Sequence, residues 1–76
     1  MAIQDDIARV EQNIREIEQR IERQNAVIAQ ALESGLPTEA PRNFLMFLRE
    51  TLRLSRDHLA RLLADEVMER GPQNPP

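Results

Sequence analysis

Apolar residues recur along the first half of the chain at alternating spacings of four and three. This pattern is typical of a helix that packs along one narrow seam, because positions three and four residues apart fall on the same helical face. The other positions of this stretch are largely polar, as on a solvated surface. The pattern predicts a helix over about residues 3–34, with a seam formed by Ile3, Ile7, Val10, Ile14, Ile17, Ile21, Gln24, Ile28 and Ala31.

The second half of the chain repeats the same spacing with leucine as the main apolar residue. Thr38 is a suitable N-cap for a helix here, and Pro41 is tolerated because the earliest helical N–H groups have no partner within the helix. We therefore predict a helix over about residues 38–70, with a seam formed by Leu45, Leu48, Leu52, Ser55, Leu59, Leu62 and Glu66.

A short break separates the two predicted helices. Gly35 can adopt the left-handed conformation that ends many helices, and Leu36 can then fold back on the last turn. Pro37 cannot continue a helix, so residues 35–37 are predicted to form a turn. Residues 71–76 contain three prolines and are expected to form a flexible tail.

Two helices of about 32 residues, each ~48 Å long, joined by so short a turn imply an antiparallel arrangement. The predicted fold class is all-α, an antiparallel two-helix coiled-coil hairpin in which Ile-rich and Leu-rich seams meet. If the turn is symmetric, the expected layers are Ile28 with Leu45, Ile21 with Leu52, Ile17 with Ser55, Ile14 with Leu59, and Val10 with Leu62 or Leu63.

The second helix carries more apolar residues than its seam uses. Phe47, Thr51, Leu54 and His58 form a second ridge beside the seam, and Phe44 lies close to it near the turn. A single hairpin leaves each seam open on one side, and pairing two hairpins into a four-helix bundle closes it. We therefore expect a homodimer whose interface contains Phe44, Phe47, Leu54 and His58. The alternative is that these are singly exposed apolar residues, as on any surface.

Arginines on another side of the second helix suggest a second kind of partner. Arg42, Arg49, Arg53 and Arg56 share one stripe. Such a stripe can track phosphates, so a dimeric hairpin that binds RNA or DNA is the alternative function. No aromatic residue interleaves with the stripe to stack on bases, and the acids of the first helix can neutralise the arginines. An acidic protein partner is a further possibility.

The composition excludes most other kinds of chemistry. The chain has no cysteine and one histidine, and Asp57 and His58 point about 100° apart on a helix, so they do not form a catalytic dyad. We expect no enzymatic activity, no cofactor and no metal. A net charge of −3 and the absence of a long apolar run argue against membrane association. With no signal peptide apparent, the sequence predicts a cytoplasmic protein.

Residues on both sides of the turn follow the pattern G-x-x-T, then L-L-x-x-L-x-x-T, then H-x-x-x-L-L. The matching residues are Gly35, Thr38, Phe44, Leu45, Leu48, Glu50, Thr51, Leu54, His58, Leu62 and Leu63, preceded by Ile21, Arg23, Gln24, Ile28 and Leu32. In this pattern the chain resembles a group of small uncharacterised helical-hairpin proteins common in rhizobia and related alphaproteobacteria. The resemblance covers about residues 21–63 and implies a bacterial cytoplasmic hairpin with no assigned activity. Pro41 departs from the group, which usually has alanine there.

These observations together predict a self-associating hairpin that acts as a small protein–protein interaction or regulatory module.

Overall fold

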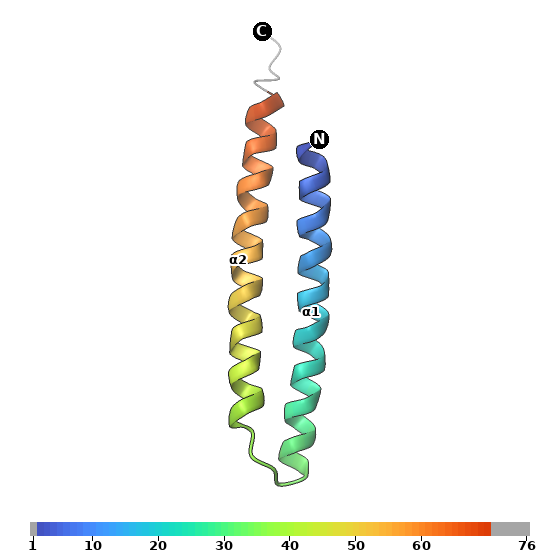
Figure 1. Ribbon diagram of the computed structural model, residues 1–76, viewed down its shortest axis with the longest axis vertical. Coiled ribbons are helices and arrows are strands. Elements are labelled where there is room, and N and C mark those ends of the chain that lie inside the picture. The colour runs from blue at the N-terminus through green and yellow to red at the C-terminus, as the bar shows by residue number, and fades with distance from the viewer. Residues whose placement is uncertain (1, 71–76) are drawn as a thin grey trace.

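The computed structural model describes residues 2–70 and consists there of two α-helices, α1 (Ile3–Glu33) and α2 (Glu39–Arg70). Figure 1 shows them side by side and antiparallel, with the N-terminus of α1 near the C-terminal end of α2. We call this the open end and the opposite one the turn end. The predicted all-α hairpin is confirmed, and no strand occurs between residues 2 and 70. The predicted tail, residues 71–76, lies outside the described residues.

The end of α1 is fixed by backbone hydrogen bonds around Gly35. The Gly35 N–H donates to the Leu32 carbonyl at 3.2 Å, and the Leu36 N–H donates to the Ala31 carbonyl at 2.8 Å. Gly35 has a φ of +70°, as predicted. This pair of bonds around a left-handed residue is the Schellman motif, which satisfies carbonyls that the helix itself leaves unpaired.

Replacing Gly35 by alanine is expected to lower the free energy of unfolding by about 1 kcal/mol, because a side chain disfavours left-handed backbone. A Cβ atom at this position meets nothing within 4 Å, so the cost comes from the backbone alone. Urea unfolding followed by circular dichroism measures the change. Gly35→Asn is the control and should lose less, since asparagine tolerates this conformation. An alanine variant as stable as the parent would contradict the argument.

The start of α2 differs in one detail from the expectation for Thr38. Its carbonyl accepts the first helical hydrogen bond, from the Arg42 N–H at 3.0 Å, so Thr38 occupies the N-cap position. Its hydroxyl accepts a hydrogen bond from Nε of Arg42 at 2.9 Å. Pro41, the third residue of α2, has no N–H to offer the hydroxyl. The threonine side chain therefore fixes an arginine rather than the backbone of the first turn.

The core is a single line of side chains between the helices. The buried ones are Ile7, Ile14, Ile17 and Ile28 of α1 and Leu45 and Leu48 of α2. The half-buried ones include Ile21, Gln24, Leu52, Ser55, Leu59, Leu62 and Glu66. All of these positions belong to the two seams that the spacing predicts. No described side chain is less than 2% exposed, so the core is thin.

Gln24 interrupts the apolar seam of α1 near the turn end. Its side-chain Nε2 donates to the backbone carbonyl of Pro41 at 3.0 Å, across the hairpin. Because the amide has found a partner on the other helix, a polar side chain is tolerated inside the seam. The bond also ties α1 to the first turn of α2.

Candidate self-association surface

The ridge predicted on α2 lies open to solvent. Phe44, Phe47 and Leu54 are 49%, 62% and 54% exposed, and His58 is exposed as well. Thr51 is half-buried, and its hydroxyl donates to the carbonyl of Phe47 at 2.9 Å. This bond satisfies the hydroxyl within the helix, so the residue presents mainly its methyl group to its surroundings. We call Phe47, Thr51, Leu54 and His58 the α2 ridge.

Phe44 and Phe47, the only aromatic residues of the chain, form a stacked pair. Their ring centroids are 6.1 Å apart and the rings are inclined by 19°. Residues three apart on a helix are neighbours, so the pair is held by α2 alone. Two stacked rings that are about half exposed form a firm apolar projection at the turn end, which we call the aromatic pair.

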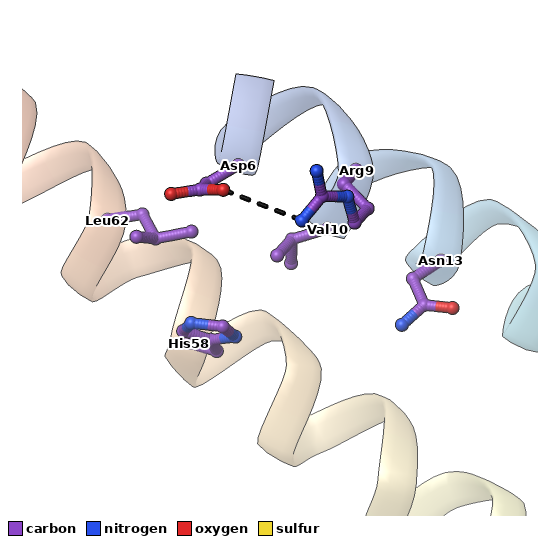
Figure 2. Close-up of a pocket in the computed structure, with 6 residues that line it drawn as sticks. All are labelled: Asp6, Arg9, Val10, Asn13, His58 and Leu62. Carbon is purple, nitrogen blue, oxygen red and sulfur yellow. Dashed lines mark ion pairs between the residues drawn. The ribbon is translucent and has the colours of Figure 1, made fainter. Parts of the chain in front are cut away.

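A hollow lies at the other end of the hairpin, between α1 and α2. Figure 2 shows the six side chains that line it, from Asp6, Arg9, Val10 and Asn13 on α1 and from His58 and Leu62 on α2. Val10 and Leu62 are its apolar part. The polar groups surround them, and the Arg9 guanidinium contacts the Asp6 carboxylate at 3.6 Å. This open-end hollow has a volume of about 350 Å³.

The residues that line the hollow show which leucine lies near Val10. The sequence predicted either Leu62 or Leu63 as its partner. The structure places Leu62 beside Val10, while Leu63 is 42% exposed. Sequence reasoning did not find the hollow itself. The available signal was Val10, a smaller side chain than the isoleucines that occupy most other seam positions of α1. A shorter side chain in the seam leaves space beside it between the two helices.

Further apolar side chains are exposed at the turn end. Val27, Leu32 and Leu36 are exposed, and Val27 and Leu36 line a shallow hollow together with Ala31. Ile28, which is next to Val27 in the chain, is buried in the seam, as the spacing predicts. The turn end therefore carries the aromatic pair of α2 and an apolar group on and beside the last turns of α1.

The arginine stripe is largely occupied by contacts within the chain. Arg42 donates to Thr38, and the Arg56 guanidinium donates to Glu18 of α1 at 3.0 Å. Arg53 contacts both Glu50 and Asp57. Arg49 alone among the four has no hydrogen bond or ion pair within the described residues. Three of the four arginines therefore already have partners within the chain. For two of them, Arg53 and Arg56, the partners are carboxylates.

The contact with Arg53 affects the titration of Glu50. The Arg53 guanidinium donates a hydrogen bond to the Glu50 carboxylate and attracts its charge, which lowers the pKa of Glu50 below its ordinary value. The same pair raises the pKa of Arg53. Both side chains are exposed, so their contribution to stability is small. It is present above the ordinary pKa of a glutamate and disappears as the pH falls through the lowered pKa.

An NMR titration of the side-chain carboxyl carbons is expected to give Glu50 a pKa below the ordinary value of a glutamate, because the Arg53 guanidinium donates to its carboxylate. Replacing Arg53 by glutamine should return the pKa of Glu50 to the ordinary range, since the charge and the fixed geometry are both lost. Arg49→Gln is the matched control and should leave it in place. A low pKa that survives the loss of Arg53 would show that another group is its cause.

Little else in the described residues suggests chemistry. No three histidine, cysteine, aspartate or glutamate side chains there come together as a metal site. Neither helix, as far as it is described, has an apolar run long enough to cross a bilayer. No family model, curated protein or solved structure matches the chain. What the ridge, the aromatic pair and the hollow can bind therefore follows from their own shape, exposure and charge.

Proposed function

We propose that this protein is a non-enzymatic helical hairpin that self-associates through the α2 ridge and acts as a small protein–protein interaction or regulatory module. The assembly is a homodimer in which two hairpins form a four-helix bundle. In keeping with the resemblance to small rhizobial hairpin proteins, its site of action is the bacterial cytoplasm.

The observation that carries the proposal is that the hairpin buries few apolar side chains and leaves large ones exposed on its surface. Every buried apolar side chain lies in one line, and none described is fully enclosed, while Phe47 and Leu54 are more than half exposed on the same ridge. Contiguous exposed apolar side chains are typical of protein–protein contact sites. A second layer of helices would remove the ridge from water and cover the seam on one side.

Nucleic-acid binding through the arginine stripe is the second candidate, and the contacts favour it less. Binding to phosphates would compete with the carboxylates of Glu18, Glu50 and Asp57 for Arg53 and Arg56. The exposed aromatic rings follow the ridge and are spaced away from the stripe on the helix, so they do not supply stacking platforms between the arginines. Within the described residues Arg49 is the one cation of the stripe that has no hydrogen bond or ion pair.

Static light scattering over a range of protein concentrations and at two salt concentrations tests the proposal. The expected mass is twice the 8.8 kDa of the chain, and it should be unaffected by salt because the contact is apolar. A helical monomer at all concentrations would refute self-association. If the dimer binds RNA or DNA with an affinity that falls steeply with salt, and Arg49→Gln weakens it, the second candidate would replace the proposed module.

A further inference from the structure

The spacing of the α2 ridge reads the same in both directions. Its members, Phe47, Thr51, Leu54 and His58, are separated by four, three and four residues. Two copies of such a ridge can lie against each other antiparallel about a two-fold axis midway between Thr51 and Leu54. Phe47 of each copy then meets His58 of the other, and Thr51 meets Leu54. A two-fold contact requires this kind of reciprocal pairing.

The same arrangement brings a projection onto a hollow. Phe47 and His58 are eleven residues apart, about three helical turns, so their side chains leave α2 in nearly the same direction. His58 also lines the open-end hollow with Val10 and Leu62. When Phe47 of one copy lies opposite His58 of the other, the aromatic pair lies over that hollow. A cavity of ~150 Å³ can accept a benzene molecule, so the hollow of about 350 Å³ has room for a phenyl ring.

One charge in line with the ridge favours the antiparallel arrangement over a parallel one. Asp65 is seven residues from His58, so its side chain leaves α2 in nearly the same direction. In a parallel pair of α2 helices each ridge position faces its own copy, so Asp65 faces Asp65. In the antiparallel pair Asp65 lies opposite Ala40, because paired residue numbers have the same sum as 47 and 58. Like charges in register repel, and the antiparallel pair avoids this contact.

The occupants of the hollow also differ between the two arrangements. In the parallel pair the two hollows lie at the same end, beside each other, and the two aromatic pairs meet at the other end. Both hollows would then lack an apolar group to fill them. Val10 and Leu62 would gain no contacts on that side. The antiparallel pair fills both hollows with residues that are otherwise exposed.

We propose that two copies of this chain dimerise antiparallel through α2, with Phe44 and Phe47 of each copy seated over the hollow formed by Val10, His58 and Leu62 of the other. This inference rests on the proposed self-association and adds its orientation, its register and the site that each copy completes in the other. The flank of α1 on this side carries polar residues such as Asn13 and Arg20, which lie at the wet rim of the contact.

Distances between spin labels distinguish the two orientations. The chain has no cysteine, so one introduced cysteine gives one label per copy. Asn43→Cys, Glu50→Cys and Arg61→Cys use exposed positions on one flank of α2, beside the ridge. In the antiparallel dimer the separation along the helix grows by about 3 Å for each residue from the axis, giving about 29, 8 and 26 Å at the three positions. In a parallel dimer it is about zero at every position.

Double electron–electron resonance on the full-length labelled chains measures these distances. A long, short, long series supports the antiparallel dimer. Similar short distances at all three positions overturn the orientation and leave self-association intact. The absence of any dipolar coupling, together with a monomeric mass, overturns self-association and the orientation with it. Circular dichroism of each labelled chain checks that its helix content equals that of the parent.

A charge exchange tests the pairing of position 47 with position 58. Phe47→Glu and His58→Arg are each expected to weaken the dimer at least about tenfold, because each places an unpaired charge in the contact. Combining them should restore most of the loss, since the introduced carboxylate of one copy then faces the introduced guanidinium of the other. A combined variant no tighter than Phe47→Glu alone would overturn this register.

Discussion

Replacing Phe47 and Leu54 together by glutamate is expected to convert the proposed dimer into monomers or into unfolded chain. Each substitution occurs twice in a dimer, and losing the contacts of four apolar side chains at about 1 kcal/mol each weakens association by ~4 kcal/mol, roughly a thousandfold in Kd. The cost of placing carboxylates in the contact adds to this. Light scattering measures the mass, and circular dichroism shows whether the remaining monomers keep their helices.

The same helix offers a matched control. Met46 and Val67 are 66% and 65% exposed and lie off the ridge. Changing both to glutamate removes two exposed apolar side chains and adds the same charge, so a general effect of charge or hydrophobicity would appear in both variants. We expect the control to remain a dimer. An unchanged oligomer in the Phe47 and Leu54 variant would refute the assigned surface, and dissociation of both variants would show that the effect is not specific to the ridge.

Much of the fold could be predicted because each of its determinants is local in sequence. The alternation of three and four residues between apolar positions specifies which side of each helix turns inward, and the buried residues follow that spacing from Ile7 to Ile28. A glycine before a proline-containing turn specifies where the chain reverses, and Gly35 has the positive φ that this requires. Neither inference depends on how the two helices slide past each other.

The features that escaped prediction depend on contacts between side chains. The open-end hollow is lined by Val10, a short side chain for this seam, and by Leu62, which lies there in place of Leu63. Arg56 meets Glu18, thirty-eight positions away in the sequence, and such a contact follows only once the register of the helices is known. The hydroxyl of Thr38 engages Arg42 because Pro41 leaves no N–H at the third position of α2.

The two flanks of α2 have different properties. In the proposed dimer this difference determines which flank is covered by the second copy and which stays in solvent. One flank carries the ridge and the aromatic pair, and the other carries the arginine stripe with its carboxylate partners. If the ridge is covered by a second copy, the stripe stays in solvent on each hairpin. Any further partner of the dimer would therefore meet charged side chains, where binding is sensitive to salt.

The second large effect is expected from Leu48→Ala. Leu48 is 3% exposed, the lowest value among the core residues. Truncating a buried leucine to alanine costs about 2–5 kcal/mol, because apolar contacts are lost and a cavity remains. In a fold with so thin a core this is a large part of the total stability, and helices and dimer should be lost together.

Leu63→Ala supplies the comparison, because the same atoms are removed from a side chain that is 42% exposed. Its cost should stay near or below about 1 kcal/mol, since less apolar surface returns to water and no enclosed cavity forms. Urea unfolding of both variants must be compared at one protein concentration, because the midpoint of a protein that dimerises, as proposed for this chain, depends on concentration. Equal midpoints would mean that Leu48 is no more important for packing than Leu63 and that the line of buried residues between α1 and α2 does not hold the hairpin together.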